Sequence, residues 1–136
     1  MRMTPGKAIV AYLIAVPVFF LIDLIWLGVA ARSFYQRHLG YIMRPEVNWT
    51  AAIVFYMIFI VGIILFAVKP GLEAQSPLRS LLYGAAFGFF TYATYDLTNL
   101  ATVRDWPLIV AIVDMAWGTV LCGLVAWATC LISTRL

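Results

Sequence analysis

The chain has 136 residues, of which 65% are hydrophobic and only 11% are charged, and its formal net charge is +3. Soluble domains carry about 25% charged residues, and a chain this short could not bury so much apolar surface in one water-soluble core. The composition therefore indicates a membrane protein, and the small, scattered positive charge argues against a nucleic-acid partner.

Four apolar segments are each close to the roughly 20 residues that a helix needs to cross a bilayer. In chain order they cover about residues 8–31, 50–68, 80–103 and 108–132. Pro70, Pro77 and Pro107 stand where helices should end or begin. The segments are too continuous to be barrel strands, which alternate apolar and polar residues. The sequence therefore predicts an all-α fold, an integral membrane four-helix bundle that forms a single transmembrane domain over residues 1–136.

The segment between the first two spans, "RSFYQRHLGYIMRPEVNW" (residues 32–49), mixes charged and apolar residues. Phe34, Tyr35, Leu39 and Ile42 supply its apolar positions. This pattern is typical of an amphipathic segment that lies on the membrane surface. A second interpretation is that the segment covers a binding site inside the bundle.

The orientation in the membrane is predicted from the nine basic residues. Five of them fall on the side that bears both termini and four on the other: Arg2, Lys7, Lys69, Arg79 and Arg135 against Arg32, Arg37, Arg44 and Arg104. Because basic residues favour the cytoplasmic side, we expect a multi-pass protein with both termini in the cytoplasm. The near balance leaves open insertion in both directions and assembly as a homodimer.

Three of the six acidic residues, Asp23, Asp96 and Asp114, fall inside the predicted spans. An ionised Asp at a helix centre costs roughly 2.5 to 3.5 kcal/mol, so three of them would cost on the order of 8–10 kcal/mol. The four spans contain no Lys or Arg that would neutralise them. These acids must therefore be hydrated, protonated, hydrogen-bonded to one another, or matched by a bound molecule.

The three acids lie at similar depths, seven to nine residues from the span ends that face the first and third loops. This spacing places each carboxyl group about 10–13 Å below that surface. On the third span, small and polar residues recur every four positions at Gly84, Gly88, Tyr92 and Asp96, which indicates a packed face. The predicted ligand-binding site collects the inward-facing polar and aromatic residues at this level: Asp23, Trp26, Tyr56, Tyr92, Asp96, Asn99, Asp114 and Trp117.

Structural interpretations remain open for parts of this site. Asn99 also suits a role as an interhelical hydrogen-bonding residue, and Trp26 and Trp117 also suit ordinary packing. Three aspartates can in principle hold a hard cation, but their surroundings offer few further oxygen ligands. The sequence also shows no cluster of His and Cys that is typical of zinc, haem or iron–sulfur sites. We therefore expect neither a metal nor a cofactor.

The motifs Thr-Tyr-Asp-Leu-Thr-Asn (residues 94–99) and Val-Asp-Met-Ala-Trp-Gly (113–118) carry a family resemblance. Together with "DLIWLG" (23–28) and "FYMIFIVGIILFAVKPGL" (55–72), they resemble a bacterial family of predicted inner-membrane proteins catalogued as a domain of unknown function. The similarity extends over nearly the whole chain. The resemblance implies a four-helix protein of the bacterial inner membrane and brings no substrate, cofactor or catalytic residue.

Three classes of function fit these features. The leading hypothesis is a binding protein for a membrane lipid or a small amphipathic ligand, whose polar or cationic head group meets the acids and aromatic rings. The first alternative is a small proton-coupled transporter, in which buried carboxyl groups carry protons or cations. The second alternative is a membrane-embedded lipid-modifying enzyme, in which a buried Asp performs isomerase-like acid–base chemistry.

Overall fold

The computed structural model describes residues 2–136, which form helices and, within that range, no strands. The elements follow in the order α1 (Pro5–Ile25), the π-helix η1 (Trp26–Ala31), α2 (Arg32–Leu39), α3 (Trp49–Ile63), the π-helix η2 (Ile64–Val68), α4 (Lys69–Glu73), α5 (Pro77–Thr102) and α6 (Leu108–Thr134). The expectation of an all-α membrane protein is thereby confirmed at the level of fold class.

Local capping explains where three of the helices begin. The side-chain oxygens of Thr4, Asn48 and Ser76 each accept a hydrogen bond from a backbone N–H in the first turn of α1, α3 and α5, at 3.1–3.2 Å. Pro5 and Pro77 occupy the first helical position, where the missing N–H has no intrahelical partner to lose. The starts of these helices therefore follow directly from the sequence.

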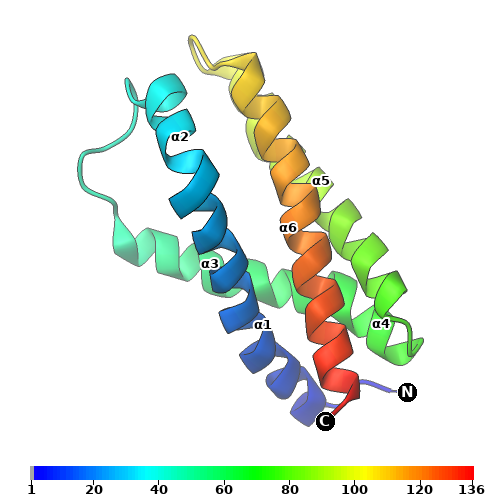
Figure 1. Ribbon diagram of the computed structural model, residues 1–136. Coiled ribbons are helices and arrows are strands. Elements are labelled where there is room, and N and C mark those ends of the chain that lie inside the picture. Colours follow the sequence, from blue (N-terminus) through cyan, green and yellow to red (C-terminus); the bar gives the residue numbers. More distant parts are fainter. Residues whose placement is uncertain (1) are drawn as a thin grey trace.

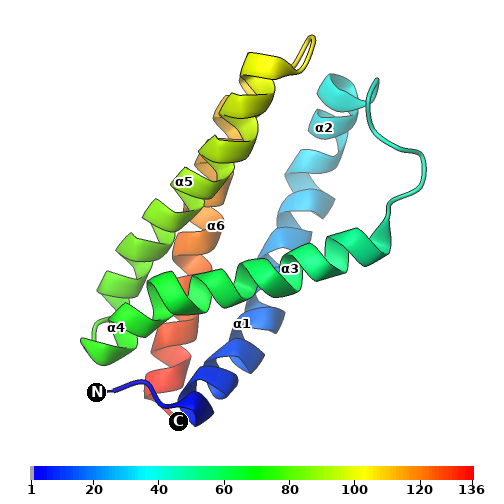
Figure 2. The ribbon, with the colours of Figure 1, turned by 180° about the vertical axis from the view of Figure 1, so that it is seen from behind.

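The helices join into rods that run back and forth between two ends of the molecule. The α1, η1 and α2 segments follow one another without a break, and so do α3, η2 and α4. In Figure 1 the α1–α2 rod rises to the end that bears the α5–α6 turn, and both termini lie at the opposite end. Figure 2 shows that α3 begins at mid-height and descends obliquely across the other helices to α4.

Three helical stretches are long and apolar enough to cross a membrane: Pro5–Val29, Trp49–Glu73 and Leu108–Thr134. Helix α5 has 26 residues, about 39 Å at 1.5 Å per residue, and therefore has sufficient length. It is not among the three because it carries more polar residues, among them the run of Thr94, Asp96, Thr98 and Asn99. The structure thus confirms a multi-pass membrane protein, with three candidate spans where the sequence predicted four.

Two predicted helix ends differ from the structure. The first helical rod does not end near residue 31 but continues to Leu39, and Gly40 caps it. The second continues past Val68 to Glu73, although Pro70 lies inside this stretch. The π-type turns of η2 come directly before Pro70, and we infer that their wider winding accommodates the proline ring without ending the rod.

The tightest helix pair is α5 with α6, which pack through small residues. A Cβ atom added to Gly84 would lie 2.4 Å from the Cys122 carbonyl oxygen, and one added to Gly88 would lie 2.0 Å from the Gly118 carbonyl oxygen. Only hydrogen atoms fit at these positions of α5. The predicted packed face of α5 therefore faces α6, and the same face carries the fully buried Asp96.

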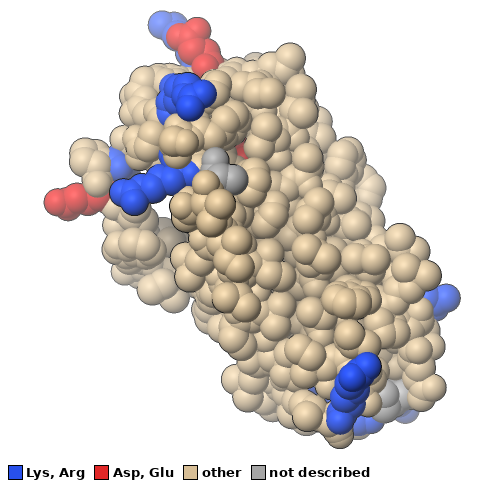
Figure 3. All heavy atoms as spheres, viewed as in Figure 1, with Lys and Arg blue, Asp and Glu red and all other residues tan. Residues whose placement is uncertain are grey.

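The surface agrees with insertion in a bilayer. Figure 3 shows that the Lys, Arg, Asp and Glu side chains of this face gather at the two ends of the molecule. Large apolar side chains are exposed on the helices between those ends, among them Leu13, Leu21 and Val120. In water these side chains would be destabilising, whereas in a bilayer they face lipid chains of the same polarity.

Candidate functional site

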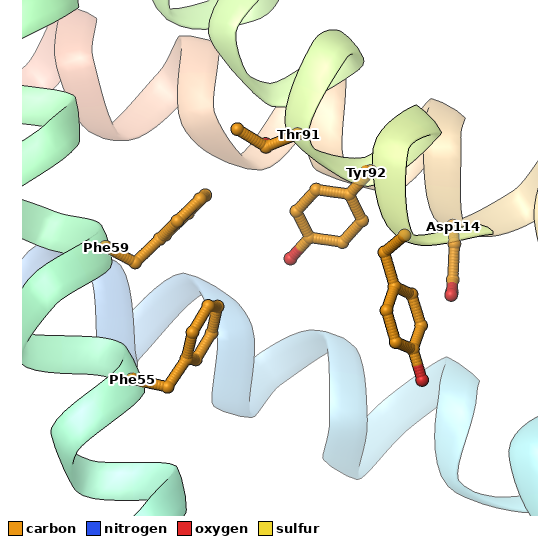
Figure 4. Close-up of a pocket in the computed structure, with 6 residues that line it drawn as sticks. Phe55, Phe59, Thr91, Tyr92 and Asp114 are labelled. Atoms are coloured by element: carbon orange, nitrogen blue, oxygen red, sulfur yellow. The ribbon is translucent and has the colours of Figure 1, made fainter. Parts of the chain in front are cut away.

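A cavity of about 560 Å³ lies between α3, α5 and α6. Its walls are mainly aromatic, with one carboxyl group, and consist of Phe55, Phe59, Thr91, Tyr92, Tyr95 and Asp114. Figure 4 shows Phe55 and Phe59 on one side and Thr91 and Tyr92 on the other, with Asp114 at the far end. The cavity therefore has an apolar body and a polar end.

The aromatic walls are held by contacts among the rings themselves. Phe55 stacks on Phe59 with ring centroids 5.3 Å apart, and Phe59 meets Tyr92 edge-on at 6.4 Å. The Tyr92 hydroxyl points into the space between these walls (Figure 4). Phe55 and Tyr95 are 51% and 57% exposed, so the cavity opens to the surface between α3 and α5.

The polar end of the cavity holds a pair of carboxyl groups. Asp114 is 8% exposed, and its Oδ1 accepts a hydrogen bond from the Tyr35 hydroxyl of α2. Asp96 of α5 lies beside Asp114 but is fully buried. Neither Asp96 oxygen has a hydrogen-bond partner among residues 2–136, and the same holds for Nε1 of the neighbouring Trp106. Asp96 and Trp106 therefore present unpaired polar groups behind the carboxyl group that lines the cavity.

The third intramembrane acid belongs to a separate cluster on α1. Asp23 is 9% exposed, and its Oδ1 accepts a hydrogen bond of 3.4 Å from Nε1 of Trp117. The Trp117 ring stacks on Trp26 with a centroid distance of 4.5 Å and an interplanar angle of 11°. Tyr56 of α3 interacts with the same carboxyl group. Asp23 is thus surrounded by aromatic side chains from three helices.

The structure places six of the eight residues of the predicted site in two neighbouring groups. One group is the carboxyl pair Asp96 and Asp114, and the other comprises Asp23, Trp26, Tyr56 and Trp117. Tyr92 lies between them, close to both Asp23 and Asp114. Asn99 lies beside Tyr95 and does not line the cavity. Within residues 2–136, no three His, Cys, Asp or Glu side chains are grouped so that they could hold a metal ion.

Several residues of the site were not included in the prediction. Phe55 and Phe59 lie four residues apart on α3, yet nothing in an apolar span distinguishes a cavity wall from a lipid-facing row. Tyr35 looked like part of a surface segment because Arg32 and Arg37 flank it. The useful signal was the lack of any helix-breaking residue between 31 and 39, which allows α1 to continue and carry Tyr35 to Asp114.

The chain beyond α2 is attached to the opposite helix pair. The Tyr41 hydroxyl donates a hydrogen bond of 2.6 Å to the backbone oxygen of Asp105, in the turn between α5 and α6. Asp105 adopts a left-handed backbone conformation, with φ of 60°, in this turn. Tyr35 and Tyr41 therefore connect the segment of residues 32–49 to α6 and to the α5–α6 turn at the end where the carboxyl pair lies.

The comparison with protein families gives one result. A family model described as a predicted membrane protein (DUF2177) matches residues 8–131. No curated protein and no solved structure matches the chain. The matched region includes both groups of site residues and all three candidate spans except their outermost residues. The chain therefore belongs to the DUF2177 family of predicted membrane proteins.

Proposed function

We propose that this protein binds a lipid or a small amphipathic molecule from the bilayer in the lateral cavity between α3 and α5. The observation that carries the proposal is the composition of the cavity walls, where aromatic rings surround most of the space and Asp114 is the one carboxyl group at its end. An amphipathic molecule would place its apolar part among the rings and its polar head at Asp114. Transport and lipid modification, the two alternatives, would begin with the same binding step.

The dimensions of the cavity support a small-molecule ligand. Ligand sites in proteins typically have volumes of about 300–1,000 Å³ and are mostly apolar, with a few well-placed polar groups. The cavity has about 560 Å³ and two tyrosine side chains besides its carboxyl group. Phe55 and Tyr95 are exposed at its opening, and in a bilayer this opening would give a membrane-dissolved molecule a route that does not pass through water.

The proposal includes four membrane crossings, with α5 as the fourth. Helix α5 has sufficient length, packs tightly on α6, and buries Asp96 against that helix, so its polar residues need not face lipid. Both termini lie at one end of the molecule (Figure 1), as four crossings require. The small excess of basic residues at that end favours a cytoplasmic location of both termini in a bacterial inner membrane.

Reporter fusions test this topology. We expect fusions after residues 74 and 136 to report one side of the membrane and fusions after residues 45 and 105 to report the other, because each rod reverses the direction of the one before. The measurement is the activity of a reporter that works on one side only. Residues 74 and 136 on opposite sides would exclude the four-crossing arrangement.

A substitution that fills the cavity tests the binding function. Thr91 lines the cavity, and its hydroxyl bonds only to its own helix, at the Phe87 and Gly88 carbonyl oxygens. We expect Thr91→Trp to reduce the amount of copurifying lipid or amphipathic molecule by at least about tenfold, since an indole would occupy the space. The measurement is mass spectrometry of bound molecules at matched protein yield.

Thr94→Trp is the matched control. Thr94 lies on the same helix, is exposed, and makes the equivalent hydrogen bond to Phe90. We expect this variant to retain the parent's ligand profile. Equal profiles in the parent and in Thr91→Trp would show that the cavity is not the binding site.

A further inference from the structure

The charge balance at the polar end of the cavity restricts the class of ligand. Asp96 is fully buried, and its two oxygens have no hydrogen-bond partner within residues 2–136. The adjacent carboxyl group of Asp114 lines the cavity. A buried polar group without a partner is costly, and a buried charge without a partner costs far more. The arrangement therefore requires a proton on one carboxyl group, and a partner for any charge that remains on the other.

The groups that face the carboxyl pair provide no positive charge. They are Tyr35 from α2, Tyr92 and Tyr95 from α5, and Trp106 from the α5–α6 turn. None of the nine basic residues is among these groups, and the two that fall within the candidate spans, Lys7 and Lys69, lie close to span ends at the far end of the molecule. Any positive charge at the pair must consequently come from a bound molecule or a proton.

Two adjacent buried carboxyl groups cannot both be ionised without strong repulsion. The contacts distinguish the two groups. Asp114 accepts a hydrogen bond from the Tyr35 hydroxyl, which stabilises a carboxylate, whereas Asp96 receives no hydrogen bond from residues 2–136. The arrangement that satisfies both residues is a neutral Asp96 that donates to a charged Asp114.

We infer that the carboxyl pair carries a single negative charge on Asp114, and that the cavity accepts an amphipathic molecule with a single positive charge, such as an alkylammonium. This inference rests on the proposed function and adds the charge of the ligand. Tyr92 and Tyr95, which line the cavity together with Asp114, would present ring faces to the same ammonium group. The apolar chain would lie between Phe55 and Phe59 on one side and Thr91 on the other.

The test compares two probes that differ only in charge. Dodecyltrimethylammonium carries one positive charge, and its carbon isostere, with carbon in place of nitrogen, carries none. Affinities are measured by equilibrium dialysis of the full-length protein in nonionic micelles. We expect the parent to bind the cation at least about tenfold more tightly than the isostere.

Three substitutions locate the charge. Asp114→Asn should abolish the preference for the cation while the isostere still binds, because the shape of the cavity is kept. Asp96→Asn should retain the preference, because the Asn amide can donate to Asp114 as a neutral Asp96 would. Asp105→Asn, in the exposed α5–α6 turn, is the control and should match the parent.

The outcomes separate this inference from the proposed function. Equal affinity of the parent for the two probes would overturn the inference and leave lipid binding in place. Loss of the preference in Asp96→Asn would show that the negative charge is on Asp96 rather than on Asp114, and this result would also overturn the inference. Failure of both probes to bind, together with unchanged ligand profiles in Thr91→Trp, would overturn the proposed function itself.

Discussion

Replacing Gly88 by alanine should lower the free energy of unfolding by about 2 kcal/mol. The added Cβ would lie 2.0 Å from the Gly118 carbonyl oxygen and 2.9 Å from the Cys122 Cβ. Because the nearest atoms belong to the α6 backbone, no side chain can move to relieve the clash, and α5 must shift away from α6. Overpacking of this kind costs up to about 3 kcal/mol, from which the better helix propensity of alanine recovers up to about 1 kcal/mol. The measurement is loss of helical circular dichroism on titration of the micelle-embedded protein with sodium dodecyl sulfate.

Gly28→Ala supplies the matched control. Gly28 also lies in a helical segment, but a Cβ added there meets no atom within 4 Å. We expect this variant to be as stable as the parent or more stable by up to about 1 kcal/mol. Equal losses at the two positions would show that the close approach of α5 and α6 does not determine stability.

The sequence was sufficient to predict those parts of the fold that depend on polarity and spacing. Long uncharged segments predicted membrane helices, and the four-residue repeat through Gly84 and Gly88 predicted the face of α5 that packs on α6. The three intramembrane acids could be identified as candidate site residues because a carboxyl group inside the membrane has an unfavourable free energy of insertion whatever the arrangement of the helices. Each of these signals is local and needs no knowledge of how the helices are arranged.

The remaining features depend on arrangement, which the sequence does not encode locally. Phe55 lines a cavity, yet it is as apolar and as exposed as a residue that faces lipid. Lipid and an apolar cavity favour the same side chains, so the residue type does not distinguish the two positions. The oblique path of α3 (Figure 2) brings that residue to the cavity. Similarly, Tyr35 reaches Asp114 only because η1 and α2 extend α1, and charged neighbours concealed that continuity.

The position of the acids on α5 and α6 also links packing to function. The same face of α5 carries small residues at Gly84 and Gly88 and then Asp96, so close helix packing brings Asp96 against α6 where Asp114 lies. A bundle with bulkier residues at those glycines would hold the helices further apart and would leave Asp96 less buried against α6. The pairing of two carboxyl groups is thus a consequence of the small-residue face, and both features are needed for the proposed charge at the cavity.

Replacing Trp117 by alanine should lower the free energy of unfolding by about 3 kcal/mol. The indole stacks on Trp26 at 4.5 Å, packs against the buried core and donates the 3.4 Å hydrogen bond to Asp23. Removing the indole leaves a void and deprives the Asp23 carboxyl group of the hydrogen bond that the indole N–H donates. Large-to-small substitutions of buried aromatic residues cost about 3–5 kcal/mol in soluble proteins. We expect the lower end, because lipid solvates exposed apolar surface and only the packing and hydrogen-bond contributions are lost.

Two further variants separate these contributions. Trp117→Phe keeps a ring that can stack on Trp26 but lacks the indole N–H, and we expect it to cost about 1 kcal/mol, the usual contribution of one hydrogen bond. Trp127→Ala removes the same side chain from the same helix at a position that is 39% exposed, and it should cost less than about 1 kcal/mol. Circular dichroism on detergent titration measures all three variants. A loss in Trp127→Ala as large as that in Trp117→Ala would mean that the stacked pair beside Asp23 makes no special contribution.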